Sequence, residues 1–383
     1  MAEQRFTYLV IGHLRKLKRF YSALRWIYRR VSKLPSQILR HAPAFTKCYG
    51  PPSGFFSGLE FIHRKYEGAV IVPSQSCEPY GERTLVHLSG LEQDKNQPWP
   101  IFWLYIPSAR LIGEGLALVD DENRLMAEST FSQSGDVTDS AYWHVRLSKP
   151  QAIKGHATSL ISRWGNSGYW HWLMDSLPRL ALLPKFPDDT QILVPPLRPW
   201  MRWFIVRLNL AARCIETSAK HVTIEHYFFS SPTSMTGCHN PYAIRFLRDN
   251  FLGFASSKNN FPRKFYIIRE GFTRGIQNEN EVRSFFINKG WGLIAPETLS
   301  IEDQIRLFAN AEAIAGIHGS AFTNLLWCSP GCEVIEFAPN NFLAGAFEIL
   351  AKNLGLRHQF IICEADNHHQ VRVDLNLLVS MVD

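Results

Sequence analysis

The chain has 383 residues, 46% of them hydrophobic and 13% aromatic, so it is long enough for two apolar cores and too apolar for a disordered protein. Its net charge is +7, yet residues 1–40 hold ten lysines and arginines against one glutamate, which leaves −2 for the remainder. A protein that binds nucleic acid usually spreads basic charge over its folded surface, so we expect no nucleic-acid partner.

A basic amphipathic helix is predicted for residues 13–33. Apolar side chains recur every three to four residues from Leu14 to Val31, with cations between them. No run reaches the roughly 18 apolar residues that span a bilayer, and the charges interrupt any signal-peptide core. We expect this helix to lie on an anionic membrane surface; the alternative is a solvated helix packed on the protein body.

The seven cysteines are scattered and odd in number, and no Asn-x-Ser/Thr acceptor occurs. Cys328 and Cys332 are four residues apart, but no second pair or nearby histidine completes a zinc set. These features predict free thiols and a cytoplasmic protein.

The region before residue 150 is predicted to be rich in β-structure. Residues 34–60, rich in Pro, Gly and Ser, are typical of a connector. Short β-rich runs then alternate with turn residues at 69–73, 84–88 and 99–106.

Beyond residue 155, strands and helices alternate, which predicts an α/β protein with parallel, helix-covered sheets. The first series has strands at 157–164 and 191–194 and helices at 169–183 and 199–210. The second has strands at 264–268, 291–295, 313–317 and 333–337 and helices at 279–289, 301–311, 321–327 and 346–354. A linker is predicted at 256–262. Two such units would leave a ligand cleft at the carboxyl ends of their strands.

The stretch from Ala315 to Leu326 carries the strongest functional signal. An apolar run breaks into small and polar residues and then resumes at helical spacing, which predicts a strand, a tight turn and a helix start. Gly316 and Gly319 would let the backbone approach a ligand, and the free N–H groups of the helix would face a phosphate or diphosphate. The alternative is an ordinary β–α turn.

A second candidate is the pair His171 and Asp175, near the start of the helix at 169–183. Residues four apart share one helical face, and a carboxylate beside an imidazole raises its basicity and fixes its tautomer. A general base that takes a hydroxyl proton needs this arrangement. The alternative is a helix whose histidine caps or packs.

A third candidate lies in the loop after the strand at 264–268. Arg269 and Arg274 could pair with phosphate oxygens, because the guanidinium fork matches that anion. Asn278 is predicted to cap the next helix, with Glu281 at the capping-box position. No Asp-x-Asp metal motif and no Walker loop occur, and His368-His369 is predicted to be a solvated turn.

Three blocks with this order and spacing are similar to those of glycosyltransferase family 61. They are Tyr169-x-His171-Trp-Leu-x-Asp175-x-Leu-Pro-Arg-Leu180, Arg269-x4-Arg274-x3-Asn278-Glu279, and Gly316-x-His318-Gly319-Ser-x-x-Thr323-Asn324-Leu, the last followed by Pro330-Gly331-x-x-Val334-Ile335-Glu336. The chain resembles the bacterial members, often labelled capsular polysaccharide biosynthesis proteins, over about residues 155–340. Gly271-Phe272 departs from the polar residues expected between the two arginines.

The resemblance implies a GT-B-like fold, in which two Rossmann-like domains face a cleft. The expected divisions are the basic helix and connector at 1–45, an acceptor-side domain at 46–258 with a β-rich part at 60–150 and an α/β part at 155–250, and a nucleotide-sugar-binding domain at 259–383. The resemblance also implies inverting, metal-independent transfer of a hexosyl or pentosyl group from a nucleotide sugar. The nucleotide is expected to be UDP, and no cofactor is expected. The acceptor would be a hydroxyl of a polysaccharide or lipid-linked glycan at the inner face of the membrane.

On this basis each motif receives an expected role. The donor side comprises Arg269, Arg274, Asn278, Gly316, His318, Gly319, Ser320, Ala321, Thr323, Asn324 and Glu336. The acceptor side comprises Asn166, Tyr169 and Trp170, with His171 as the base steadied by Asp175 and no metal ligand. His318 is expected to donate a hydrogen bond to the donor substrate. The alternative function is a catalytically inactive nucleotide-sugar-binding or scaffold protein of a polysaccharide assembly complex.

Overall fold

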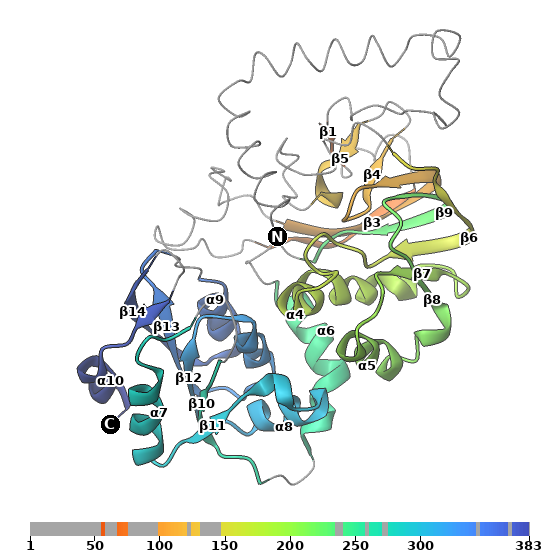
Figure 1. The fold of residues 1–383 in the computed structure, drawn as a ribbon. Coiled ribbons are helices and arrows are strands. Elements are labelled where there is room, and N and C mark those ends of the chain that lie inside the picture. Colours follow the sequence, from red (N-terminus) through yellow and green to blue (C-terminus); the bar gives the residue numbers. More distant parts are fainter. Residues whose placement is uncertain are drawn as a thin grey trace, which may run out of the picture.

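The computed structural model describes residues 55–57, 67–75, 99–120, 124–130, 147–233, 240–256, 260–269, 275–341, 345–366 and 370–382. Within these ranges two β-sheets are accompanied by helices, which confirms the mixed α/β class (Figure 1). The predicted basic helix at 13–33, the strand at 84–88, Arg274 and His368-His369 lie outside the described residues. None of the helices in the described ranges has both the length and the hydropathy to cross a membrane.

In the part of the chain that the structure describes, the first sheet has nine strands, in the order β1-β5-β4-β3-β9-β6-β7-β8 with β2 beside β3. Their bounds are β1 Phe55–Phe56, β2 Gly68–Gln75, β3 Trp99–Ile112, β4 Ala117–Val119, β5 Leu125–Met126, β6 Gln151–Ser159, β7 Gln191–Val194, β8 Cys214–Glu216 and β9 His221–Ser230. β9, which the sequence pattern did not predict, pairs antiparallel with β3 and parallel with β6. The β-rich part and the first α/β series therefore form one continuous sheet.

The helices of the first unit are less regular than predicted. In place of one helix at 169–183, the chain forms α4 (Tyr169–His171), a π-helical segment η3 (Trp172–Ser176) and a 3₁₀ segment η4 (Leu177–Lys185). Pro178 and Pro184 have no N–H to donate, which interrupts regular α-helical hydrogen bonding. α5 (Pro199–Arg207), α6 (Pro241–Phe251) and η6 (Leu252–Ser256) follow, and α4–α6 lie on the side of the first sheet that faces the second unit (Figure 1).

The second sheet has six strands among the described residues, in the order β11-β10-β12-β13-β14-β15. They are β10 Lys264–Ile267, β11 Gly292–Ile294, β12 Ala313–Ile317, β13 Glu333–Pro339, β14 Arg357–Ala365 and β15 Val371–Arg372, all parallel to their neighbours except β15. The first four confirm the predicted strands within two residues. β14 was not predicted, because polar residues interrupt its apolar pattern.

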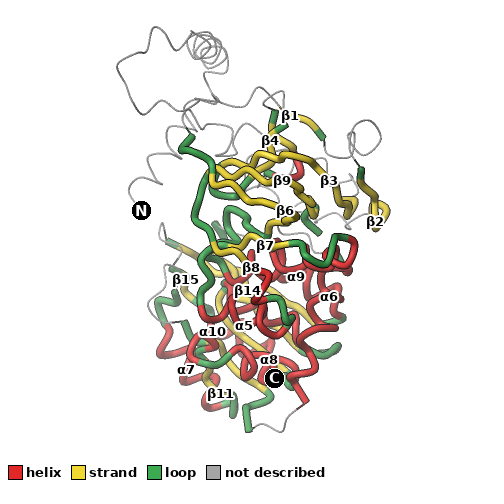
Figure 2. The backbone as a smooth tube through the Cα atoms, turned by 90° about the vertical axis from the view of Figure 1, so that its right-hand side faces the viewer, coloured by secondary structure: helices red, strands yellow, loops and turns green. Residues whose placement is uncertain are grey.

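Helices cover both faces of the second sheet. α8 (Ile301–Ala309), the 3₁₀ segment η8 (Ser320–Trp327) and α9 (Ala346–Leu354) pack on one face, and α7 (Glu279–Asn288) and α10 (Leu375–Val382) on the other. Side chains alternate accordingly, so that Phe265 and Ile314 belong to the first apolar cluster and Tyr266 and Ala315 to the second. Figure 2 shows the strands and helices of both units from the side.

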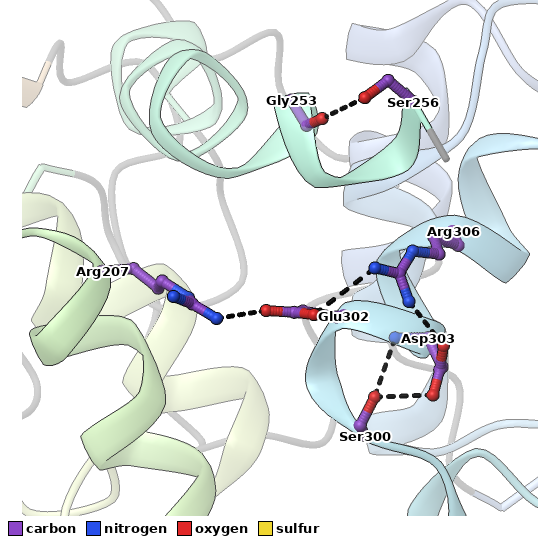
Figure 3. Close-up of polar contacts among 7 residues, drawn as sticks. All are labelled: Arg207, Gly253, Ser256, Ser300, Glu302, Asp303 and Arg306. Atoms are coloured by element: carbon purple, nitrogen blue, oxygen red, sulfur yellow. Dashed lines mark hydrogen bonds and ion pairs between the residues drawn. The ribbon is translucent and has the colours of Figure 1, made fainter. Parts of the chain in front are cut away.

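The two units share one apolar cluster. Leu173 and Phe251 of the first unit belong to the same buried cluster as Phe308 and Trp327 of the second, and the rings of Phe251 and Trp327 meet at 6.4 Å between centroids. At the edge of this contact, Arg207 of α5 forms an ion pair with Glu302 of α8 (Figure 3). The units are therefore joined by directly packed helices.

Polar contacts also fix the start of α8 (Figure 3). The Ser300 side chain accepts from the backbone N–H of Asp303 at 3.1 Å and donates to the Asp303 carboxylate at 2.7 Å, so it caps the helix. Arg306 pairs with Asp303 at 2.8 Å and with Glu302 at 3.4 Å. Glu302 is thus held on its own helix while it reaches across to the first unit.

Arg248 of α6 links this helix to the end of η8. Arg248 Nη1 donates to the carbonyls of Leu326 at 2.6 Å and Cys328 at 2.9 Å, and burial lowers the Arg248 pKa. Arg248→Ala is expected to lower the free energy of unfolding by about 1–3 kcal/mol in urea titrations. Arg263→Ala, which removes only an exposed ion pair with Glu312, should change it by less than about 1 kcal/mol. Equal effects of the two variants would contradict the assigned role.

Candidate active site

The start of α4 meets the 316–324 turn through one hydrogen bond. Tyr169 donates its hydroxyl proton to Asn324 Oδ1 at 2.9 Å, and burial raises the Tyr169 pKa, which keeps that proton in place. Asn324 is 1% exposed; its amide donates to Gln304 Oε1 at 2.9 Å, and its Oδ1 also accepts from Trp327 Nε1 at 3.1 Å. The fold thus brings together the first and third sequence blocks, which lie about 150 residues apart in the chain.

His171 and Asp175 form the pair that their spacing predicts. His171 Nδ1 lies 2.6 Å from Asp175 Oδ2, and the imidazole is 25% exposed while the carboxylate is 7% exposed. Because an ionised carboxylate can only accept, Nδ1 carries the proton and Nε2 is the acceptor of the neutral ring. This tautomer suits a general base.

Arg179 contacts the backbone of Asp175, and no role was predicted for it from the sequence. Its Nε donates to the backbone carbonyl of Asp175 at 3.0 Å, and the side chain is buried. Burial lowers the pKa of Arg179, while Tyr227 and Asp175 act in the opposite direction. The signal was available, since residue 179 follows 175 by the same four residues that separate 175 from 171.

Arg269 lies against the backbone of the third block. Its Nη1 donates to the carbonyl of His318 at 3.0 Å. A Cβ atom on Gly319 would come within 2.0 Å of the same nitrogen, so glycine is what allows the guanidinium to sit there. The structure therefore places the Arg269 guanidinium beside the start of η8, and binding of an anion there stays a prediction.

Glu336 is fully buried between two imidazoles. It accepts hydrogen bonds from His318 Nδ1 and from His358 Nε2, the second at 2.8 Å. Burial raises the Glu336 pKa, but His318 and then His358 outweigh it, so the pKa lies below its ordinary value. A direct donor contact by Glu336, as predicted, does not fit a carboxylate with 0% exposure. His318, to which it is hydrogen-bonded, is 7% exposed.

The remaining residues of the third block divide by exposure. Ser320 is exposed and Ala321 half-buried at the start of η8. Thr323 is fully buried, and its hydroxyl donates to the Ser320 carbonyl at 2.6 Å. Gly316 lies within β12, where a Cβ would meet Ile267 Cβ at 3.1 Å. Gly316, Gly319, Thr323 and Asn324 are therefore buried parts of the turn, and Ser320 and Ala321 form its outer surface.

The predicted acceptor-side residues are largely occupied by contacts within the protein. The Asn166 amide donates to the Glu114 carbonyl at 2.9 Å. Trp170 is 9% exposed and packs edge-on against Phe347 at 4.9 Å between centroids. The Phe347 ring centroid also lies 5.0 Å from that of His318. The Phe347 side chain therefore contacts both the first and the third sequence block.

The prediction that Asn278 caps α7 is confirmed for its position but not for its side chain. Asn278 occupies the N-cap position, but its side chain makes no capping hydrogen bond. It pairs instead with both backbone groups of Val373, at 3.0 Å each, because that partner satisfies the amide's donor and acceptor together. Asn278 lines a cavity of about 520 Å³ with Glu281, Arg372 and Asp374, which contains no other predicted donor residue.

Replacing Gly319 with alanine is expected to weaken binding of inorganic pyrophosphate by roughly tenfold, because the new methyl group would displace the Arg269 guanidinium. Titration calorimetry measures this change. Gly253→Ala is the matched control, since no atom lies within 4 Å of its added Cβ. Unchanged pyrophosphate affinity in Gly319→Ala would remove Arg269 from the anion site.

The fold and the geometry of this site together indicate a class of protein. A helix-covered parallel sheet that presents an arginine, a histidine–carboxylate pair and a helix start at its strand ends is typical of α/β proteins that bind phosphorylated ligands. Within the described ranges, no group of three or more His, Cys, Asp or Glu side chains is arranged to hold a metal ion.

A comparison with protein families narrows this class. Residues 169–335 match the family described as Glycosyltransferase 61. The match supports the resemblance seen in the sequence and, with it, a glycosyltransferase. It begins at Tyr169 and ends one residue before Glu336. No curated protein matches the chain.

Proposed function

We propose that the protein is an inverting, metal-independent glycosyltransferase. It would move a hexosyl or pentosyl group from a UDP-linked sugar to a hydroxyl of a polysaccharide or lipid-linked glycan. The observation that carries this proposal is the Tyr169–Asn324 hydrogen bond, which holds the helix of the His171–Asp175 pair against the turn beside Arg269. A base and an anion site on adjoining elements are what transfer from a sugar diphosphate requires.

The proposed reaction follows from these positions. The acceptor oxygen attacks the anomeric carbon and His171 Nε2 takes its proton, while the bond between that carbon and the diphosphate oxygen breaks. Asp175, supported by Arg179, stabilises the imidazolium that forms. Arg269 and the N–H groups at the start of η8 stabilise the departing diphosphate.

His318 can take the donor-facing role expected from the sequence only in its charged form. Its Nδ1 proton is engaged by Glu336, so the neutral ring offers Nε2 as an acceptor. A second proton on Nε2 would let it donate to a phosphate oxygen, with the Glu336 carboxylate balancing the charge.

We also propose a location in the cell. We place the protein at the inner face of the membrane, with residues 13–33 on anionic lipid and the active site in a cleft between domains 46–258 and 259–383. A role like that of the bacterial capsular polysaccharide proteins accords with these features.

Two measurements test the function. A thermal-shift panel of nucleotide sugars should show a higher Tm with at least one UDP-sugar, because a ligand that binds the native state stabilises it. Release of UDP in the presence of a glycan acceptor should follow. Binding without transfer or hydrolysis would favour the catalytically inactive binding or scaffold protein. A flat panel, with the control proteins responding, would contradict both functions.

A further inference from the structure

Three polar side chains form a row on one buried face of the second sheet. Glu336 of β13 lies opposite Gly316 of β12 and Phe360 of β14. His318 follows Gly316 by two residues and His358 precedes Phe360 by two, so all three polar side chains point to the face that α8, η8 and α9 cover. Strand register alone thus places two imidazoles on either side of one carboxylate.

The hydrogen bonds fix where the protons lie. Glu336 can only accept, so His318 carries a proton on Nδ1 and His358 carries one on Nε2. His358 Nδ1 is buried and has no hydrogen-bond partner among the described residues. A proton on that nitrogen would be an unpaired buried donor, so the geometry favours a neutral His358 that donates from Nε2.

Packing alone does not account for a histidine at position 358. The side chain is 4% exposed and its ring packs edge-on against Phe360 at 4.6 Å between centroids. An apolar side chain would fill the same space without leaving a ring nitrogen unpaired. What His358 adds is the N–H that satisfies the second oxygen of Glu336.

We propose that His358 is a positioning residue for His318. By donating to Glu336 it fixes the rotamer of the carboxylate and keeps it ionised, and the carboxylate then orients His318 beside Arg269. His358 lies outside the region that matches the family and outside every sequence-predicted site. The inference rests on the proposed function in one respect, namely that His318 faces the diphosphate.

Among the described residues, few other charged groups surround this carboxylate. The titratable groups that face it are His318 from the end of β12 and His358 from β14. Arg269, from the segment after β10, contacts the backbone carbonyl of His318. From the covering helices, α9 contributes Phe347 against the His318 ring and η8 contains no titratable side chain.

Two substitutions separate the hydrogen bond from the packing. His358→Phe keeps a ring beside Phe360 and removes the donor, whereas His358→Gln keeps an N–H at a similar reach. The matched control is His221→Phe, which removes a fully buried histidine of the first sheet whose Nδ1 bonds the Ser148 carbonyl at 2.7 Å.

The first readout is stability against pH, which needs no enzymatic activity. Without the His358 N–H, the Glu336 pKa should rise. The wild type should then exceed His358→Phe in stability most at pH about 7, and the difference should shrink as pH falls towards about 4 and Glu336 protonates. His358→Gln should restore most of the difference. The deficit of His221→Phe should also shrink in acid, because burial lowers the His221 pKa, so this control is compared with His358→Phe at pH about 7. A deficit of His358→Phe that is independent of pH would overturn the proposal.

The second readout is affinity for UDP and for inorganic pyrophosphate, measured by calorimetry. His358→Phe should weaken the affinity for each ligand by roughly three- to tenfold, and His358→Gln should recover it. In a Glu336→Gln background, neither substitution at position 358 should change the affinities further. Wild-type binding that His358→Phe leaves unchanged would overturn the inference and keep the proposed function. Failure of the wild type to bind either probe would contradict the donor site itself, and the positioning role with it.

Discussion

Replacing His171 with alanine is expected to lower the turnover number for sugar transfer by about 10²- to 10⁴-fold, because the acceptor hydroxyl loses the base that takes its proton. The affinity for UDP should stay within about twofold of the wild-type value, since no donor contact is removed. Asp175→Asn should lower turnover by a smaller factor, because the imidazole remains but loses the charge that stabilises its protonated form. Initial rates of UDP release, measured at saturating donor, give both numbers.

The chain offers a closely matched control for His171. His156 Nδ1 lies 2.8 Å from Asp189 Oδ1, so it too is a partly exposed histidine paired with a carboxylate. It lies on β6 of the first sheet, outside all three sequence blocks. His156→Ala should transfer sugar at the wild-type rate. Equal losses in the two variants would show that the His171 effect is structural, and full activity of His171→Ala would remove it from the mechanism.

The second large effect concerns stability. Glu336→Leu is expected to lower the free energy of unfolding by about 3–5 kcal/mol at neutral pH, because two buried imidazole N–H groups lose their shared acceptor. Glu333→Leu is the control on the same strand; Glu333 is exposed and pairs only with an exposed Arg357, so its loss should change stability by less than about 1 kcal/mol. Urea unfolding measures both.

The pH dependence of the Glu336 contribution follows from its lowered pKa. A glutamate in the unfolded chain has a pKa of about 4.3. Since the folded pKa is lower, the stabilisation is fully present above the unfolded value and is lost as pH falls through the folded value. The gap between wild type and Glu336→Leu should therefore narrow in acid. A gap that widens as pH falls would contradict an ionised Glu336.

Local sequence signals predicted part of this structure well. The apolar runs of β7, β10, β12 and β13 and the helix at Ala346–Leu354 are found where the pattern places them. The His171–Asp175 contact follows from helical spacing, and it survives the π-helical segment in between. Such features depend on neighbours in the chain, so the sequence alone was sufficient.

Features that depend on distant partners could not be predicted in this way. β9 and β14 are strands because flanking strands supply their hydrogen bonds, while their own residues mix polar and apolar types. The bond between Glu336 and His358 spans 22 residues and requires the register of two strands. Asn278 has the sequence of a cap, but the Val373 backbone competes for the same amide from 95 residues away.

The apolar cluster shared by the two units also limits how this protein can move and be divided. Swinging the units apart as rigid halves would expose rings such as Phe251 and Trp327 to water, so ligands are admitted more readily by small sliding shifts of helices than by a wide hinge opening. For the same reason, fragments cut near residue 258 should aggregate when produced separately and recover when produced together.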